Sequence, residues 1–290
     1  MHATRTSVDN ASHLGYQTII EPSRGWISLQ LHALWQYREL LYFLVWRDLK
    51  VRYKQTALGI AWIVLQPVIS MVVFSLLFGG LLKVPSDGVP YPIFAYAALL
   101  PWNYFSSSLN RSSTSLVGSA SLITKVYFPR LLIPLASVLS GLVDFLVAFL
   151  VLAGLIVFYH IQLTLAAILL PALLFLAMLT ALGFGMWLSA LNVRFRDINM
   201  LMPFIIQIWM YLTPVIYSPD VIPAHFRFLL GLNPMTAVVE GFRWALLGPY
   251  LTGSHSTVTG FLLPILIMAV ALISGAFFFR RTERTFADII

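Results

Sequence analysis

One carboxylic acid lies well inside a long apolar stretch of this sequence. Asp144 is the only charged residue between positions 131 and 159. Because taking a charge out of water is expensive, such an acid indicates a functional group, a hydrogen bond between helices or a place in a water-filled passage. The sequence leaves these alternatives open. Proton-coupled transporters usually carry several ionisable groups of this kind, so a single acid argues against that class.

Residues arranged for nucleotide or metal chemistry are not found in the sequence. A phosphate-binding loop needs Gly-Lys-Ser/Thr, and none of the four lysines, Lys50, Lys54, Lys83 and Lys125, follows a glycine. The 6 histidines are isolated, and no two aspartates form a DxD pair. We therefore predict that the chain is not an enzyme and holds no metal or cofactor, with any ATP and Mg²⁺ bound by a separate subunit.

Two residues of opposite charge lie in a short apolar segment near the C-terminus. Asn233-Pro234 begins it, as an N-cap followed by proline at the first helical position. Glu240 and Arg243 are three residues apart, so a helix places both side chains on one face. They either pair with each other or line an exit for a polar substrate.

The composition requires lipid as the solvent for much of the chain. Hydrophobic residues make up 59% of it and charged residues 10%. Soluble domains average about 45–50% apolar and about 25% charged residues. A net charge of +7 would suggest nucleic acid in a soluble protein, but basic cytoplasmic loops explain it here, so no nucleic-acid partner is expected.

Six stretches are long and apolar enough to be transmembrane helices, each of which needs roughly 20 residues. We predict an all-α polytopic membrane protein with a polar tail at 1–30, a single transmembrane domain at 31–280 and a second tail at 281–290. The predicted spans are residues 61–82, 91–109, 131–159, 165–191, 198–217 and 261–279.

The basic residues predict the orientation of these spans. Alternate segments on one side of the six spans hold 15 of the 18 Lys and Arg residues. Basic residues collect in cytoplasmic loops, so both termini are expected in the cytoplasm.

Residues 31–55 are too charged to cross a membrane. Leu34, Tyr37, Leu41 and Leu44 recur at helical spacing, and basic residues occupy another stripe. This pattern indicates an amphipathic helix at the cytoplasmic interface, either an ordinary anchor or a gate.

Two further segments between the spans are informative. Residues 106–121 are rich in serine and form either a solvated loop or, with Leu116 on an apolar face, a short docking helix. The apolar pieces within 218–259 are about 10–14 residues long, which is typical of re-entrant or interfacial helices.

Five motifs stand out in the sequence: LGIAWIVLQPVI (58–69), LITKVYFPRLLIPL (122–135), NVRFRDI (192–198), TPVIY (213–217) and NPMTAVVEGFR (233–243). Together they resemble the ABC-2 type permeases, in particular the branch that exports O-antigen, capsule or teichoic-acid polysaccharide. The likeness covers about residues 30–280.

The resemblance implies a homodimer in the bacterial inner membrane, bound to two copies of a separate ATPase. The expected substrate is a polysaccharide on an undecaprenyl-type lipid, threaded between the protomers. The resemblance also implies a gate helix at 31–55, a coupling helix near 110–126 and outer re-entrant helices within 222–248. A permease for drugs or small lipids and, from a different class, an ion-coupled transporter are the alternatives.

The candidate site residues fall into three groups. Those predicted for ATPase coupling are Arg111, Leu116, Lys125, Tyr127, Phe128, Arg130, Arg194, Arg196 and Asp197. Asp197 has a second interpretation, as a cap of the fifth span. The channel or gate aromatics are Trp35, Tyr37 and Trp62, unless they belong to the interfacial belt. The outer-helix group is Asn233, Pro234, Glu240 and Arg243.

Overall fold

The computed structural model describes residues 31–54, 61–251, 259–284 and 286, and this part of the chain contains helices and no strand. The elements are α1 (Leu31–Gln36), α2 (Arg38–Tyr53), α3 (Ala61–Phe74), η1 (Ser75–Leu81), α4 (Tyr91–Gly118), α5 (Ala120–Lys125), α6 (Leu132–Phe158), η2 (Leu165–Leu169), α7 (Leu170–Arg194), α8 (Asp197–Leu212), η3 (Pro219–Val221), η4 (Ala224–Phe226), α9 (Arg227–Gly231), α10 (Pro234–Leu247), η5 (Gly248–Tyr250) and α11 (Thr259–Glu283).

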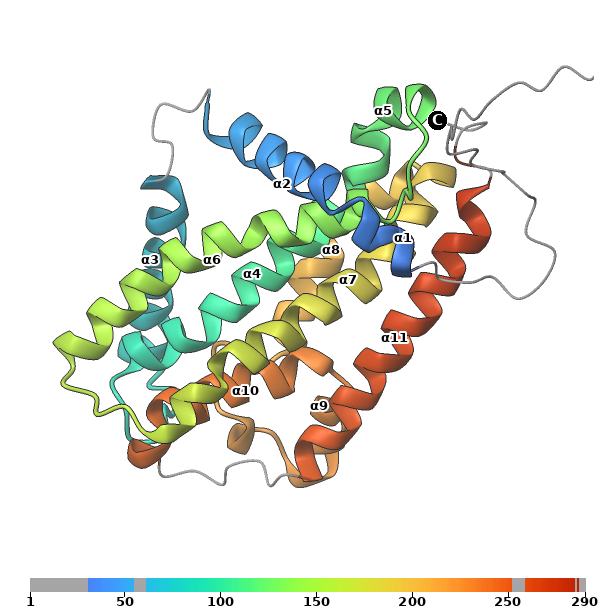
Figure 1. The fold of residues 1–290 in the computed structure, drawn as a ribbon. Helices are drawn as coiled ribbons and strands as arrows, with labels where there is room; N and C mark the ends of the chain where they lie inside the picture. Colours follow the sequence, from blue (N-terminus) through green and yellow to red (C-terminus); the bar gives the residue numbers. More distant parts are fainter. Residues whose placement is uncertain (1–30, 55–60, 252–258, 285, 287–290) are drawn as a thin grey trace, which may run out of the picture.

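Long apolar helices form the body of the molecule. In Figure 1, α4, α6, α7 and α11 run side by side on a slant, with α3 at one edge. Within the described residues, four helical stretches are long and apolar enough to cross a membrane: Ala61–Leu81, Leu132–Phe158, Leu165–Arg194 and Leu262–Glu283. These match four of the predicted spans. The other two predicted spans correspond to α4, which is long but polar in its second half, and to α8, which has 16 residues.

The helix at the second predicted span is longer than the sequence suggested. We expected the span to end near residue 109, but α4 continues to Gly118, and most of the serines in its second half are buried. Small side chains explain this, because they let α6 and α7 approach closely, and the Asn192 side chain on α7 donates to the Ser113 carbonyl (2.9 Å). The solvated-loop interpretation of 106–121 is therefore wrong, and the segment between the spans shortens to residues 119–131.

The segment predicted to form a gate helix is helical in two pieces, α1 and α2, and α2 crosses over α6 in Figure 1. Its predicted apolar stripe packs on the protein itself, where Leu44 is buried with Leu116 and Ile123. A second, aromatic face of α1 and α2 is exposed, and it contains Trp35, Tyr42, Phe43 and Trp46.

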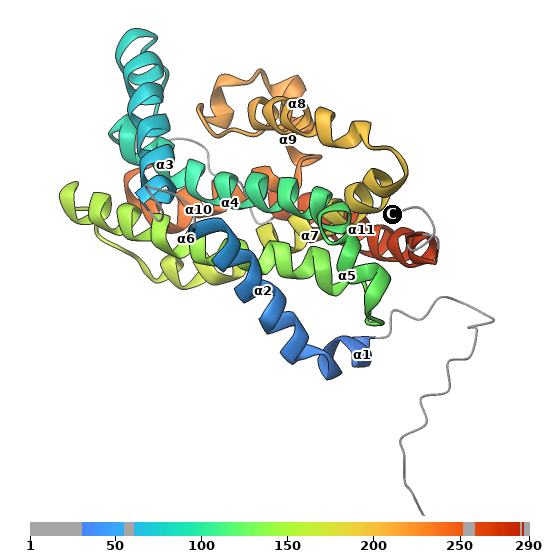
Figure 2. The same cartoon turned by 90° about the horizontal axis from the view of Figure 1, so that it is seen from above.

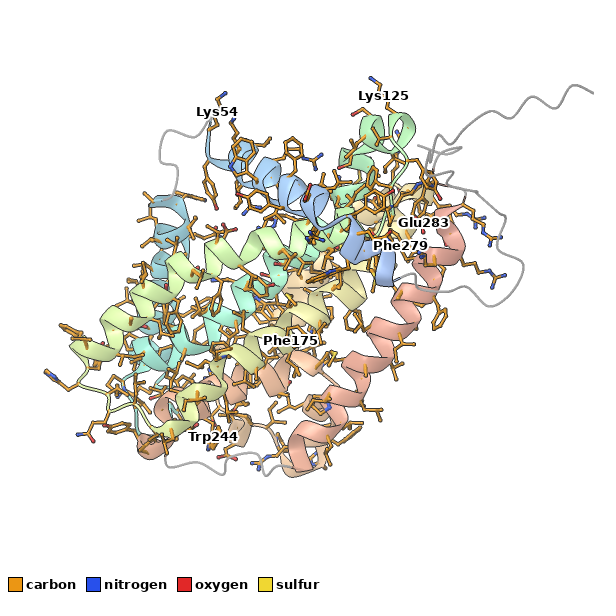
Figure 3. All side chains as sticks on the ribbon, in the orientation of Figure 1. Lys54, Lys125, Phe175, Trp244, Phe279 and Glu283 are labelled. Carbon is orange, nitrogen blue, oxygen red and sulfur yellow. The ribbon has the colours of Figure 1, made fainter. Side chains whose placement is uncertain are left out.

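The two ends of the molecule carry different elements. Figure 3 places Lys54 at the end of α2, Lys125 at the end of α5 and Glu283 at the end of α11 toward the same end of the molecule. It places Trp244 of α10 at the opposite end. The orientation of these two ends relative to the cytoplasm stays a prediction from the basic residues.

The helix α10 begins as the sequence indicated. The Asn233 side chain accepts a hydrogen bond from the Met235 amide (3.0 Å), so Asn233 is the N-cap and Pro234 follows it. Most of α10 is buried against α4 and α7. The predicted outer helix is therefore an integral part of the protein core.

Two glycines let α7 and α11 cross at backbone distance. A methyl group added at Gly275 would lie 2.5 Å from the Gly183 carbonyl oxygen. We expect Gly275→Ala to lower the melting temperature of the purified protein, because backbone cannot move aside cheaply. A thermal unfolding series in detergent checks this. Gly154→Ala is the matched control, since nothing lies within 4 Å of its added methyl. Equal melting temperatures for both variants would contradict the close crossing.

Candidate functional site

A cavity of about 710 Å³ lies among the long helices. Its walls come from the end of α2, from α3, from the middle of α4 and from α6, with one residue of α8. Figure 2 shows α3 and α8 on the same side of α4, with α6 and α2 on the other. Its polar and charged lining residues are Arg52, Tyr53, Gln66, Asn103, Tyr104, Ser106, Ser107, Asn110, Arg111 and Asp144.

A cluster of charges forms one wall of this cavity. The Asp144 carboxylate on α6 accepts hydrogen bonds from Arg52 and Tyr53 on α2 and from Arg111 on α4 (3.3 Å). Arg52 also donates to the Ser140 hydroxyl (3.1 Å). The lone acid in the third span is thus the point at which three helices meet.

The environment of Tyr53 keeps its phenol group protonated. Burial, followed by the Asp144 hydrogen bond, raises the pKa of Tyr53 above its ordinary value. The phenol therefore stays protonated at neutral pH and acts as a donor to the carboxylate.

Small residues make room for the second arginine. A methyl group at Gly141 of α6 would lie 2.5 Å from Arg111 Nη2 and 2.6 Å from the Ser108 hydroxyl. Arg111 Nη2 itself lies 3.4 Å from that hydroxyl. The guanidinium therefore fits between α4 and α6 only because position 141 has no side chain.

Three amide side chains of the cavity have no hydrogen-bond partner within the described part of the chain. They belong to Gln66, Asn103 and Asn110. Amides on membrane-spanning helices are costly against lipid, so these side chains indicate water or a polar ligand in the cavity.

The structure separates the three predicted aromatic residues. Trp62 lines the cavity with 52% of its surface exposed. Tyr37 is partly buried against the cluster around Leu44, and Trp35 is exposed on α1, away from the cavity lining. Of these three residues, only Trp62 is placed to contact a molecule in this cavity.

The residues predicted for ATPase coupling are scattered. Lys125, Val126 and Tyr127 are exposed at the end of α5, and Tyr127 is 76% exposed. Arg111 lies in the cavity instead of the coupling segment, and Leu116 is fully buried, so neither presents a surface to a partner.

The remaining coupling candidates lie at the ends of helices or in the segments between helices. Phe128 is buried with Leu131, and the Arg130 amide donates to Glu283 at the end of α11 (3.1 Å). Arg194 and Arg196 are exposed beside α8. Asp197 is the first residue of α8, where its charge favours the helix terminus, although no side-chain cap is formed.

Glu240 and Arg243 form the ion pair that was one of the two alternatives (2.9 Å). Arg243 is 1% exposed, and its guanidinium carbon lies 3.7 Å from the Phe94 ring centroid. Its guanidinium donates to four backbone carbonyls, those of Phe94, Pro214, Val215 and Tyr217. It ties three segments together and does not line a passage in this structure.

A cavity that presents polar and charged side chains between long helices, in a sequence without a nucleotide motif, is what a transport subunit needs. Residues 39–247 match the family model described as ABC-2 type transporter. The chain belongs to the ABC-2 type transporter family.

Three relatives illustrate the range of this match within the ABC-2 family. The chain is 32% identical over 216 residues to the O-antigen export system permease protein RfbA of Myxococcus xanthus, covering 73% of this chain and 82% of the relative. It is 27% identical over 256 residues to the protein of the same name from Klebsiella pneumoniae, covering 87% and 95%. It is 24% identical over 214 residues to the polysialic acid transport protein KpsM of Escherichia coli, covering 71% and 80%.

Sequence reasoning missed the partners of Asp144. Arg52 and Tyr53 lay in the segment predicted as a gate helix, and neither was singled out. A signal did exist, because an acid inside a span often pairs with a cation, and Arg52 and Lys54 lie shortly before the first predicted span.

Proposed function

We propose that this chain is the transmembrane permease subunit of an ATP-driven exporter that moves a lipid-linked polysaccharide across the bacterial inner membrane. The observation that carries the proposal is the cavity with unused amides and Trp62, in a chain whose relatives are named for O-antigen export and polysialic acid transport. Amides and an exposed indole suit sugar hydroxyls and sugar C–H faces.

The energy for export comes, in this proposal, from a separate ATPase. The sequence contains no phosphate-binding loop, so a partner has to push on an element joined to the spans. The exposed tip of α5 suits this role because residues 126–131 connect it directly to α6.

The passage is proposed to be completed by a second copy of the chain. The outward faces of α3 and α8 are apolar and exposed, and both helices contribute residues to the lining of the cavity. Two copies that meet along these helices would enclose one continuous path that is lined in part by polar side chains. A homodimer with two ATPase subunits is therefore the assembly that we infer.

For topology we expect six spans with both termini in the cytoplasm. Reporter fusions after residues 86, 162 and 240 should be external, and fusions after 120, 195 and 290 should be cytoplasmic. The reason is the basic bias, because 15 of the 18 Lys and Arg residues lie on one side. An external reporter at 120 would contradict six spans, since α4 ends at Gly118.

The exposed tip of α5 offers a test of coupling. We expect Tyr127→Asp to lower co-purification of the partner ATPase by about tenfold or more, because losing an aromatic anchor costs roughly 2 kcal/mol. Gln162→Glu is the matched control, since it adds a charge at an exposed position in the segment that joins α6 to η2. Equal recovery of the ATPase with both variants would move the contact away from α5.

The proposed function predicts a specific phenotype. A strain that lacks this chain should lose surface polysaccharide and accumulate the lipid-linked polymer on the cytoplasmic side, and the wild-type chain should restore export. Unchanged surface polymer in the deletion strain, grown under conditions in which the gene is expressed, would contradict the proposal.

A further inference from the structure

The connection between α5 and α6 is bound to the end of the last long helix. The backbone N–H of Arg130 donates a hydrogen bond to the Glu283 carboxylate (3.1 Å), and the Arg130 guanidinium donates to the Glu283 backbone carbonyl. Glu283 is the last residue of α11, and 153 positions separate it from Arg130 in the chain. Two segments that are distant in the sequence are therefore joined by two hydrogen bonds.

The position of the Glu283 carboxylate is fixed from both sides. On its own helix, Arg280 Nη1 lies 2.8 Å from the other carboxylate oxygen, and the two side chains are only 13% and 14% exposed. Arg130 lies between α5 and α6, where a backbone N–H has no preceding helical turn to donate to, so Glu283 supplies the acceptor. The carboxylate also precedes the N-terminus of α6, where the helix dipole favours a negative charge.

An apolar contact accompanies these hydrogen bonds. Phe279 and Phe286 lie on either side of Glu283 in the sequence, are fully buried, and pack edge to face with ring centroids 5.3 Å apart. Both belong to the same buried cluster as Ile123 of α5 and Phe128 of the connection. Figure 3 shows Phe279 and Glu283 together at this end of α11. The end of α11 is thus joined to the α5 region by polar and apolar contacts.

The same helix is packed rigidly on α7. Gly183 and Gly275 let the two backbones approach closely, and the Trp187 and Phe278 rings stack with centroids 4.2 Å apart. Helices packed this closely move together more readily than they deform. A displacement of α5 can therefore reach α6 through the chain, and α7 and α11 through the contact between Arg130 and Glu283.

We propose that Glu283 is a positioning residue for export, which binds α11 to the α5–α6 connection so that the ATPase moves α6, α7 and α11 as one body. This inference rests on the proposed function, because it requires an ATPase that acts at α5. Without the Glu283 side chain, α5 still presents its exposed tip and still moves with α6, but α11 no longer follows. ATP is then hydrolysed without a matching movement of polymer.

The test measures ATP hydrolysis and polymer delivery in the same vesicles, which contain the full chain, its ATPase and a labelled lipid-linked polymer. We expect Glu283→Ala to retain ATP hydrolysis and to lower the polymer delivered per ATP by about tenfold, the effect of losing one charge-assisted hydrogen bond. A purely structural defect would lower the yield of the complex and both rates together, and would leave their ratio unchanged.

Two further variants separate the hydrogen bond from the charge and from the helix end. Glu283→Gln keeps an oxygen that can accept from the Arg130 amide, so it should deliver more polymer per ATP than Glu283→Ala. Arg281→Ala is the matched control, since it removes a charged side chain that is exposed on the same helix two positions earlier. It should keep the wild-type ratio.

A cross-link tests whether the contact has to stay closed. The chain contains no cysteine, so the double variant Arg130→Cys with Glu283→Cys can be joined by a short, reducible thiol reagent, with a cysteine-free form of the ATPase. The double variant should hydrolyse ATP with little polymer delivery. The cross-link should restore delivery, and its reduction should remove delivery again.

Two results would overturn the inference. They are a wild-type ratio of polymer to ATP in Glu283→Ala, and a cross-linked double variant that hydrolyses ATP without delivering polymer. Both leave the proposed function intact, because the wild-type chain still delivers polymer in the same vesicles. Failure of the proposed function is a separate result, namely a deletion strain with normal surface polymer.

Discussion

Replacing Arg243 with methionine is expected to remove most of the folded protein from the membrane. The substitution leaves the carbonyls of Pro214, Val215 and Tyr217 without their shared donor in a buried site. It also leaves the Glu240 carboxylate without this ion-pair partner. Breaking a buried, hydrogen-bonded charge in this way costs about 3–5 kcal/mol, a large share of the stability of most domains. Fluorescence size-exclusion chromatography of a fusion measures the folded fraction.

The pairing with Glu240 is expected to be the smaller part of this effect. Glu240→Gln leaves Arg243 its four carbonyl partners, so most of the protein should still fold. The double variant, Glu240→Gln with Arg243→Met, should recover only a small part of the lost stability, because neutralising Glu240 does nothing for the unpaired carbonyls. From the sequence alone, two isolated opposite charges would have predicted recovery in the double variant. Full recovery would show that the carbonyl bonds contribute little.

Asp144→Asn is expected to have the second-largest effect, on both stability and export. The amide keeps the shape of the side chain but leaves Arg52 and Arg111 facing each other without a counter-charge. We expect a loss of roughly 2–3 kcal/mol in the free energy of unfolding, below the ~3–5 kcal/mol of a fully buried pair, because 19% of the Asp144 side chain is exposed. Thermal unfolding in detergent and surface polymer in complemented cells measure the two effects.

A second substitution separates the charge from the packing. Asp144→Asn combined with Arg52→Gln removes one charge of each sign and should be more stable than Asp144→Asn alone. Asp220→Asn is the matched control, since it neutralises an acid paired with Arg227 at a more exposed site. If Asp144→Asn lowered the melting temperature no more than Asp220→Asn does, the cluster would not hold α2 against α6.

Four of the six predicted spans match long apolar helices of the structure. They could be predicted from the sequence because lipid demands long apolar helices and little else satisfies the backbone there. The start of α10 was predictable for a local reason, the cap at Asn233 and the proline after it. The extent of α4 was not, because its serines are polar by composition and become buried only against Gly141 and Gly185 of two other helices. That packing is a tertiary property and has no local signal.

The candidate site was predictable only in part. Asp144 stood out because it is alone in its span, but its partners lie 92 and 33 positions away in the chain. Trp62 was predicted on aromatic content and does line the cavity. Leu116 shows the opposite error, since an apolar stripe that suits a partner protein suits the chain's own core equally well.

The most direct test of the account is transport in a purified system. The chain and its ATPase are reconstituted into vesicles that contain the fluorescently labelled lipid-linked polymer, and a glycosidase on the side opposite the ATPase reports its arrival. The account predicts polymer cleavage that requires ATP and both proteins, and that falls sharply with Arg111→Gln but not with Arg47→Gln, since Arg47 pairs with Asp48 outside the cavity. ATP hydrolysis by an intact complex without any cleavage of the polymer would contradict it.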